Sequence, residues 1–250
     1  MGYSCQTKSN GGLQSPLRRK LLMGMAALPA ISMLSRPSFA DVPATYAVNT
    51  TGLAVICGKT KATSGSIQFR SQELTKMKEN QIVQAGVGRK FQTPSIYDDL
   101  TVFENLEISY PRGRTVFGAL AFKRDAAVRD RVEEVAELIF LKDRLNMNAD
   151  LLSHGQKQWL EIGMLLIQDP DLLMLDEPVA GMSVSERVKT AELLNRIIKD
   201  RSVLVIEHDM KFVEDIAHMV TVLHQGQILS EGSMEHVKND PKVIEVYLGH

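Results

Sequence analysis

The sequence contains little cysteine, few aromatic residues and almost no net charge. Its two cysteines, Cys5 and Cys57, are too few for a disulfide framework or a zinc site built from thiolates. The formal net charge of −1 gives no overall electrostatic reason to expect binding to nucleic acid. No apolar run is long enough to span a bilayer as a helix. With 250 residues and 44% hydrophobic content, the chain can bury one substantial core.

Residues 1–40 differ from the rest of the chain because they carry basic residues and no acidic one. A basic segment, an apolar run at residues 21–34 and a small-x-small ending at Ala40 follow in the order of a secretory signal peptide. The pair Arg18 and Arg19 gives this leader a twin-arginine character. An amphipathic or disordered leader is the alternative, and the order of the three parts favours the signal peptide.

The most informative stretch is residues 151–178, which predicts a helix followed by a buried strand. Ser153 and Gln156 have the spacing of a capping box, so we expect a helix to begin there. The Asp-Pro-Asp sequence at residues 169–171 predicts its end. The wholly apolar run at residues 172–175 then predicts a central strand covered on both faces.

Two carboxylates, Asp176 and Glu177, follow that expected strand directly. In open α/β sheets, the carboxyl ends of the strands form the edge at which ligands bind. An Asp at a strand end can hold Mg²⁺, usually through water, and the adjacent Glu can orient or deprotonate a water for attack on a phosphate. A strand end with two solvated acids is the alternative, and the motif just upstream argues against it.

That motif is LSHGQ at residues 152–156, which resembles the signature motif of the ATP-binding cassette (ABC) ATPases. The family motif is normally LSGGQ, so His154 stands in place of a glycine. Residues 172–177 resemble the Walker B strand of the same family, with Glu177 as its catalytic glutamate. The resemblance covers residues 55–250. It implies an α/β fold, namely a P-loop NTPase-like and mostly parallel sheet with an inserted helical subdomain.

The resemblance also implies which residues form the site. It assigns nucleotide binding to three residues of the signature motif: Ser153, Gly155 and Gln156. It assigns catalytic roles to three further residues: Glu177, His208 and Gln92. Asp176 would hold Mg²⁺, and Gln92 would reach both Mg²⁺ and the attacking water. A lone His is usually structural and a lone Gln is usually a solvated loop residue, but His208 directly follows an expected buried strand at residues 202–206.

The sequence lacks the phosphate loop G-x-x-x-x-G-K-[ST], whose glycines let backbone N–H groups surround phosphates. The GKT at residues 58–60 does not fit this pattern. The pattern needs a glycine at position 53, where the chain has Leu53, and Gly52 lies one place too far upstream. The resemblance places the loop at residues 43–51 instead, where only Thr50 and Thr51 match. Asn49 stands where the phosphate-binding Lys belongs. We therefore expect Thr50 and Thr51 to be the remaining loop residues of a degenerate Walker A motif.

These observations divide the chain into three segments. Residues 1–40 are a signal-peptide-like leader, residues 41–54 are a junction with the degenerate loop, and residues 55–250 are the ABC ATPase core. Within that core, the helical subdomain covers about residues 93–152. The front of the cassette has been replaced, and neither the leader nor residues 41–49 show the alternation of a half-buried strand. We therefore expect the sheet to lack its N-terminal strands and to have an open edge.

Four segments of the chain resemble the ATPase subunits of branched-chain amino acid and urea importers: residues 88–109, 175–183, 206–210 and 243–250. Among these subunits, the resemblance is closest to the urea type. The implied function is an ATP-binding ATPase subunit that energises an importer, impaired because Walker A is absent. The alternative is a non-catalytic cassette remnant that acts at most as an interaction module. A third class, an ABC ATPase acting on DNA or ribosomes, is weaker because there is no tandem cassette or long coiled coil.

Cofactors, partners and location follow from the same resemblance. The cofactors are ATP and Mg²⁺. The partners are a second ATPase subunit, transmembrane permease subunits and, indirectly, a periplasmic solute-binding protein, with no nucleic acid. The expected location is the cytoplasmic face of the inner membrane, which conflicts with the twin-arginine character of residues 1–40.

Overall fold

The computed structural model describes residues 22–24, 32–34, 50–90, 95–111 and 126–248. Within them, a seven-stranded sheet has the order β5-β6-β7-β1-β8-β9, and β2 pairs additionally with β7. β1 runs parallel to β7 and β8, β5 and β7 run parallel to β6, and β9 is antiparallel to β8. The strands are β1 (Leu22–Gly24), β2 (Ser32–Leu34), β5 (Val87–Lys90), β6 (Leu172–Asp176), β7 (Ser202–Ile206), β8 (Met219–His224) and β9 (Gln227–Gly232).

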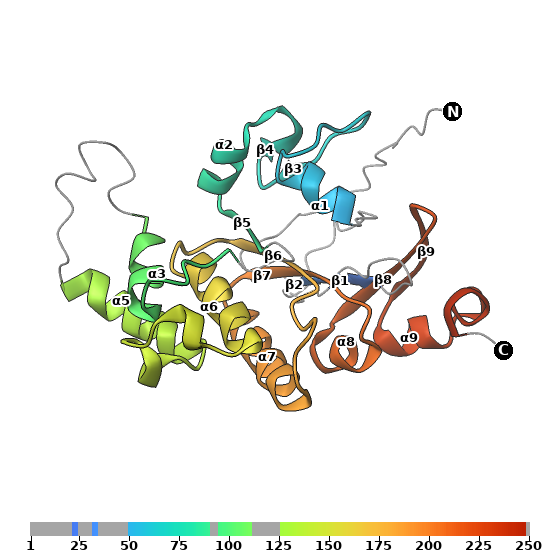
Figure 1. The fold of residues 1–250 in the computed structure, drawn as a ribbon. Helices are drawn as coiled ribbons and strands as arrows, with labels where there is room; N and C mark the ends of the chain where they lie inside the picture. Colours follow the sequence, from blue (N-terminus) through green and yellow to red (C-terminus); the bar gives the residue numbers. More distant parts are fainter. Residues whose placement is uncertain (1–21, 25–31, 35–49, 91–94, 112–125, 249–250) are drawn as a thin grey trace.

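Both faces of the central strands are buried, which explains their continuous apolar sequence. In β6, Leu173 and Leu175 belong to one hydrophobic cluster, while Leu172 and Met174 belong to another. β7 alternates in the same way. Figure 1 shows α1 and α2 on one side of the sheet and α6, α7 and α8 on the other. The expected central strand at residues 172–175 is therefore confirmed, and it extends to Asp176.

The smaller cluster is formed by the sheet and by the segment that precedes β5 in the chain. α1 (Thr50–Ile56) contributes Leu53 and Ile56, and α2 (Glu79–Gln84) contributes Ile82. Between them, β3 (Gln68–Phe69) and β4 (Gln72–Glu73) form a two-stranded antiparallel sheet, followed by the 3-10 helix η1 (Leu74–Lys76). The GKT at residues 58–60 comes after α1. A phosphate loop precedes its helix, so this position agrees with the conclusion that GKT is not a phosphate loop.

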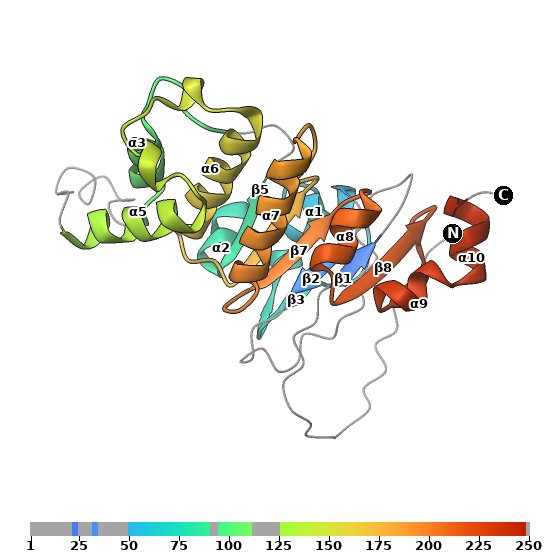
Figure 2. The same cartoon turned by 90° about the horizontal axis from the view of Figure 1, so that it is seen from below.

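The larger cluster includes the helices at one end of the molecule, which Figure 2 shows beside the sheet. Three helices pack together there: α3 (Val102–Ile108), α5 (Ala126–Leu138) and α6 (His154–Leu166), with the 3-10 helices η2 (Lys142–Arg144) and η3 (Ala149–Leu151) between α5 and α6. Gly163 permits this packing, because a Cβ there would lie 2.5 Å from Ile139 Cδ1 and 3.0 Å from Leu106 Cδ2.

Two further helices follow the central strands β6 and β7, and the last two strands, β8 and β9, form one end of the sheet. They are α7 (Val184–Ile197), after β6, and α8 (Met210–Ile216), after β7. β8 and β9 form a hairpin, in which Gln225 (φ 50°) and Gly226 (φ 79°) are the two turn residues. The chain ends in α9 (Met234–Lys238), α10 (Pro241–Val243) and a π-helical turn (Ile244–Leu248).

The expectation that the leader cannot supply strands is wrong. β1 lies between β7 and β8, with Met23 opposite Val205 and Val220, so the sheet is continuous there. The physical reason is that a strand inside a parallel sheet is held by backbone hydrogen bonds and needs no polar–apolar alternation. The expectation was wrong because it required alternating polar and apolar residues, a pattern that applies only to strands with one face in solvent. Across the described parts of the chain, no helix combines the length and the hydropathy needed to cross a membrane.

Candidate functional site

The predicted carboxylates and the predicted histidine meet at one edge of the sheet. β6 and β7 are parallel and in register from Leu172–Ser202 to Asp176–Ile206, so their carboxyl ends coincide. The Glu177 N–H donates to the Ile206 carbonyl at 2.9 Å and continues the ladder by one residue. Glu177 has φ +46°, a left-handed conformation that is costly for a non-glycine residue. This backbone turn directs the chain away from the sheet immediately after Asp176.

Glu177 and His208 face each other across the two strand ends. His208 Nδ1 lies 3.6 Å from Glu177 Oε1, and the side chains are 60% and 32% exposed, respectively. Both groups are therefore accessible to a ligand and to water. A carboxylate beside an imidazole can accept a proton from a water while the imidazole holds a neighbouring oxygen. The structure therefore brings these two residues together at the edge where the sequence placed both of them.

Glu207, between β7 and His208, was not singled out from the sequence. Its carboxylate is 1% exposed and accepts backbone N–H groups of Val179 (3.2 Å), His208 (2.9 Å) and Asp209 (3.3 Å). Burial raises the pKa of Glu207, and these hydrogen bonds oppose the rise. The three contacts join the backbone after β6 to the backbone after β7. Glu207 therefore fixes the spacing of the two segments that carry Glu177 and His208.

Asp176 is almost completely buried at the end of β6, with 1% exposure. Arg89 Nη2, from β5, lies 3.7 Å from Asp176 Oδ2. Burial raises the pKa of the Asp176 carboxyl, and the charge of Arg89 opposes this rise. Asp176 Oδ1 accepts no hydrogen bond from any described residue. A buried, unsatisfied carboxylate oxygen fits a cation ligand, as the sequence predicted for Asp176.

Within the described parts of the chain, Asp176 is not part of a cluster of metal-ligating side chains. Among the residues that the structure describes, no group of three or more His, Cys, Asp or Glu side chains could hold a metal ion. Mg²⁺ suits such a place, because it usually keeps several waters and takes one or two carboxylates plus substrate phosphates. The residues present therefore fit a Mg²⁺ that arrives with a nucleotide.

The signature residues form the N-terminus of α6. Ser153 is the N-cap, with its Oγ accepting from the Gln156 N–H at 3.2 Å, and the Gln156 side chain accepts from the Ser153 N–H at 3.0 Å. The predicted capping box is therefore confirmed. Within the described residues, the side chains of this motif form polar contacts with α6, with Arg144, with Ala180 and with Glu186 of α7, and none of these partners is Asp176, Glu177 or His208.

Two contacts tie this motif to the segment after β6. Ser153 Oγ donates to Glu186 Oε1 at 2.8 Å, and His154 Nε2 lies 3.2 Å from the Ala180 carbonyl oxygen. Gly181 adopts φ +71°, and a Cβ there would lie 3.3 Å from the His154 ring. The substitution of His for the usual glycine in the signature motif therefore adds a contact that a glycine could not make.

Three of the predicted site residues cannot be placed fully. Gln92 lies outside the described residues. Thr50 and Thr51 are the first two residues of α1, and their side chains are not described. Asn49, at the expected lysine position, also lies outside the described part of the chain.

Three residues near these sites were missed by the sequence reasoning as site residues. Arg89 lies in the family-like segment at residues 88–109 but was given no role, although its charge, three positions before Gln92, could have indicated one. Glu207 directly precedes His208 and could have been found by the same argument from the strand end. Glu186 was not predicted as a site residue, because its contact with Ser153 joins residues 33 positions apart, which no local pattern reveals.

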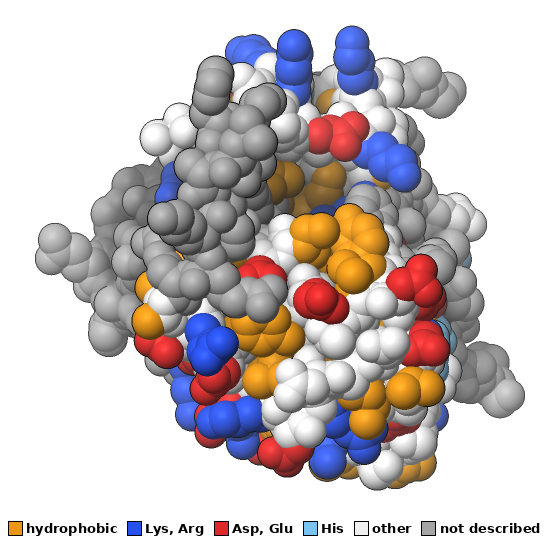
Figure 3. All heavy atoms as spheres, turned by 60° about the vertical axis from the view of Figure 1, so that its left-hand side comes forward, with side chains coloured by type: hydrophobic (Ala, Val, Ile, Leu, Met, Phe, Trp, Pro, Cys, Tyr) orange, Lys and Arg blue, Asp and Glu red, His pale blue; other side chains and the backbone are white. Residues whose placement is uncertain are grey.

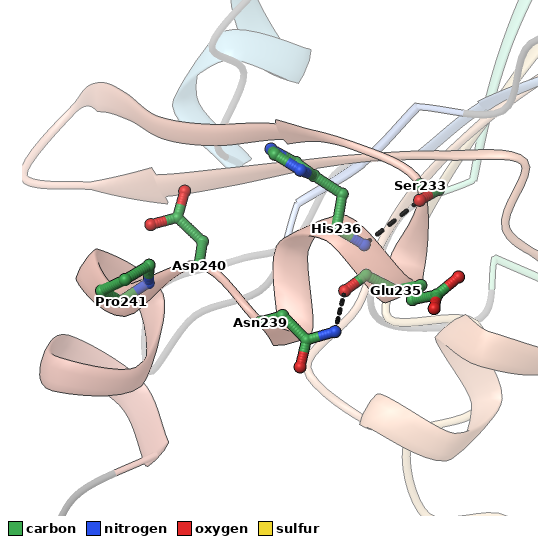
Figure 4. Close-up of a pocket in the computed structure, with 6 residues that line it drawn as sticks. All are labelled: Ser233, Glu235, His236, Asn239, Asp240 and Pro241. Carbon is green, nitrogen blue, oxygen red and sulfur yellow. Dashed lines mark hydrogen bonds between the residues drawn. The ribbon is translucent and has the colours of Figure 1, made fainter.

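A polar surface hollow of about 520 Å³ lies elsewhere, around α9 (Figure 4). Its lining residues are Ser233, Glu235, His236, Asn239, Asp240 and Pro241. Several of its polar groups serve the helix itself, since Ser233 Oγ accepts from the His236 N–H and Asn239 Nδ2 donates to the Glu235 carbonyl. The chemistry of the strand ends makes that edge, and not this hollow, the candidate site.

The fold and the site together define a nucleotide-binding cassette, an α/β domain with two carboxylates and a histidine at the strand ends. The family model described as ABC transporter matches residues 49–180, and the model described as branched-chain amino acid ATP-binding cassette transporter matches residues 227–250. The chain is 35% identical to the high-affinity branched-chain amino acid transport ATP-binding protein LivG of Escherichia coli (strain K12), over 80% of this chain and 82% of that protein.

Two further comparisons agree. The chain is 34% identical to the high-affinity branched-chain amino acid transport ATP-binding protein BraF of Pseudomonas aeruginosa, over 80% of this chain and 82% of that protein. A crystal structure of the ADP conformation of an ATP-binding cassette of an ABC transporter superposes with a TM-score of 0.68 at 26% identity, covering 95% of this chain and 100% of that one. The chain belongs to the ATP-binding subunits of the ABC transporter family.

Proposed function

We propose that this chain is the ATP-binding subunit of an ABC importer for branched-chain amino acids or urea. The observation that carries this proposal is the edge where β6 and β7 end, with Glu177 Oε1 3.6 Å from His208 Nδ1 and the buried Asp176 beside them. The named relatives, LivG and BraF, support the branched-chain amino acid branch.

Each group has a role that follows from its surroundings. Asp176, with its unsatisfied Oδ1, would hold Mg²⁺, which when bound neutralises phosphate charge. Glu177 would accept a proton from the attacking water, because its carboxylate is partly exposed and held at the strand end. His208 lies at the same edge and would contact the terminal phosphate. Gln92, two positions after the end of β5 in the sequence, would complete this set.

A single cassette does not complete the site in this proposal. The contacts of Ser153 and Gln156 are with α6, Arg144 and Glu186, so this motif would act on a nucleotide held by another subunit. Ser153, Gly155 and Gln156 of one copy would face the nucleotide on a second ATPase subunit. Such clamping makes the second subunit the first expected partner.

Impaired activity is part of the proposal. The match to the ABC transporter model begins at residue 49, and the sequence before it contains no G-x-x-x-x-G-K-[ST]. Thr50 and Thr51 are the first two residues of α1. Without the glycines and the Lys, the chain has few groups to cradle the β- and γ-phosphates. We therefore propose weak ATP binding and slow hydrolysis.

The urea branch is the finer part of the proposal. It rests on the sequence resemblance of residues 88–109, 175–183, 206–210 and 243–250 to the urea-type subunit. The division of the chain into residues 1–40, 41–54 and 55–250, with a helical subdomain at about 93–152, is proposed on the same basis.

Permease subunits are the second expected partner, with a periplasmic solute-binding protein linked through them. Apolar side chains are exposed on the face that the helical end of the molecule presents (Figure 3). Tyr97 and Ile108, beside and at the end of α3, are 52% and 58% exposed. Exposed apolar groups rimmed by charge suit a protein contact. We propose a peripheral position at the cytoplasmic face of the inner membrane, with the leader remaining a predicted signal peptide.

A non-catalytic remnant is the second candidate, and the missing phosphate loop favours it. Uptake measurements separate the two. Cells that lack the ATPase subunit of a branched-chain amino acid importer, or of a urea importer, would express this chain and be assayed for uptake of labelled leucine or urea. Restored uptake in one strain supports the importer function and selects the solute. Failure in both, with the chain bound to the permease subunits, favours the remnant.

A further inference from the structure

The hydroxyl of Ser153 is already engaged inside its own chain. Ser153 Oγ donates to Glu186 Oε1 at 2.8 Å, while the same oxygen accepts the Gln156 N–H at 3.2 Å. The hydroxyl therefore uses its only proton on an internal carboxylate. A phosphate that binds Ser153 through this proton must first displace that carboxylate.

Glu186 is held in this position from the other side. Its second oxygen, Oε2, accepts the Ser183 N–H at 2.9 Å and the Ser183 hydroxyl at 2.8 Å, which form the capping box of α7. These hydrogen bonds, with that from Ser153, lower the pKa of Glu186, so the carboxylate is ionised at neutral pH. One carboxylate thus caps α7 and engages the N-cap residue of α6.

The backbone of the signature motif leaves room for this carboxylate. A Cβ at residue 155 would lie 2.5 Å from both Cδ and Oε1 of Glu186, which is closer than real contacts allow. Gly155 therefore lets the negative charge approach the N-terminus of α6, a 13-residue helix. A helix N-terminus attracts anions through its unpaired N–H groups, and Glu186 satisfies part of that attraction internally.

His154 strengthens the same connection. Its Nε2 lies 3.2 Å from the Ala180 carbonyl oxygen, in the segment between β6 and α7. The signature motif is thus attached at two points, one on each side of Gly181. Loss of either contact alone would leave the other to hold α6 against this segment.

We infer that Glu186 is an intramolecular latch on the signature motif, a positioning residue that must release Ser153 before this motif can bind the phosphate of a nucleotide on a second copy of the chain. The inference rests on the proposed function, because it takes the signature motif to be a phosphate-binding element. In this inference, the Glu186 carboxylate competes with the phosphate for the Ser153 hydroxyl. An anionic carboxylate about 4 Å from an incoming phosphate charge in water costs about 1 kcal/mol, or about fivefold in affinity.

The test uses the full chain and inorganic phosphate as the probe. Phosphate is titrated while the amide signals of Gly155 and Gln156 are followed by NMR, in the wild type, in Glu186→Gln and in Glu186→Gln with Ser153→Ala. Glu186→Gln keeps the shape and a hydrogen-bonding oxygen but removes the charge. We expect the phosphate concentration at the midpoint of the titration to be about fivefold lower in Glu186→Gln than in the wild type. This gain in phosphate affinity should disappear when Ser153→Ala is added.

Glu104→Gln is the matched control. Glu104 forms the equivalent capping box of α3 with Thr101, through the Thr101 N–H and hydroxyl at 2.8 Å each. A general effect of weakening a helix cap would appear in both glutamine variants, so a lower midpoint in both overturns the inference. An unchanged midpoint in Glu186→Gln also overturns it, while leaving the proposed function intact. Absence of phosphate-dependent shifts in every variant overturns both the latch and the phosphate-binding role of the motif.

Discussion

His208 Nδ1 lies 3.6 Å from Glu177 Oε1, although the two residues are 31 positions apart in sequence. The pair exists because β6 and β7 are parallel neighbours in register, with Asp176 opposite Ile206. Glu207 holds the following segments together through three backbone N–H groups. The distance between this carboxylate and this imidazole is therefore set by the sheet, which suits the catalytic role proposed for them.

The first prediction concerns the role of Glu177. Replacing residues 1–51 with a complete family N-terminus, phosphate loop included, should restore Mg²⁺-dependent hydrolysis of ATP. Glu177→Gln in that repaired chain should retain ATP binding but lose turnover by at least about 10²-fold, because the water loses its base. Steady-state hydrolysis and equilibrium binding would be measured together. Turnover close to that of the parent would show that Glu177 is not the base.

The second prediction concerns a buried ion pair. Lys90 Nζ lies 3.5 Å from Glu161 Oε2, and the two residues are 0% and 5% exposed. Glu161 Oε1 also accepts the Ser95 N–H at 3.2 Å, so α6 contacts Lys90 and Ser95, the described residues on either side of the segment that contains Gln92. Burial lowers the pKa of Lys90 and raises that of Glu161, which shows what each charge would cost without its partner.

Removing one charge should therefore cost more than removing both. Glu161→Gln should lower the free energy of unfolding by about 3–5 kcal/mol, because it leaves a buried ammonium without its carboxylate. Lys90→Met with Glu161→Leu should recover most of that loss. Urea unfolding of the single and double variants measures this coupling. Additive losses in the double variant would mean that the pair does not act as a unit.

The third prediction is a pH dependence that involves Glu186. Hydrogen bonds from the Ser183 N–H, and from the hydroxyls of Ser153 and Ser183, lower its pKa. A carboxyl whose pKa is lower when folded contributes stability that is complete above its unfolded pKa, about 4.3. That contribution is lost as pH falls through the lowered folded value.

Thermal unfolding between pH 7 and pH 3 would check this. Wild type should exceed Glu186→Gln at pH 7 by up to about 1 kcal/mol, the usual size of a helix-cap contribution reduced by solvent. The difference should shrink as the pH approaches 3. A gap that stays constant across this range would mean that the ionised form of Glu186 has no special contribution.

The fourth prediction concerns the leader. β1 pairs with β7 and β8 in the middle of the sheet, so removing residues 1–40 takes away a strand that both neighbours use. A chain that starts at Asp41 should therefore be less stable and more readily aggregated, because two unpaired strand edges face each other. Limited proteolysis of the full and shortened chains compares them. Equal resistance, or a soluble processed form in the periplasm that starts at Asp41, would contradict the role of β1.

The sequence predicted the elements whose determinants are local. The capping box of Ser153 and Gln156 depends on residues only three positions apart. The buried strands at residues 172–175 and 202–206 followed from short apolar runs, and the carboxylates beyond the first of them could be assigned to the ligand edge.

The features that the sequence did not predict depend on non-local pairing. β1 was missed because pairing with β7 and β8, almost two hundred positions away, leaves no periodic pattern in residues 22–24. The contact between Ser153 and Glu186 was missed for the same reason. Arg89 was not weighed as a partner of Asp176, because the adjacency of β5 and β6 is a property of the sheet order.

Equilibrium binding of Mg-ATP tests the central claim most directly, namely that this is an ABC cassette with an intact hydrolytic edge and a lost phosphate loop. The full chain would be titrated beside the repaired chain that carries a complete family N-terminus. The repaired chain should bind Mg-ATP at least about 10²-fold more tightly, since the loop and its Lys normally neutralise the β- and γ-phosphates. Binding by the unmodified chain as tight as that of the repaired chain would contradict the account.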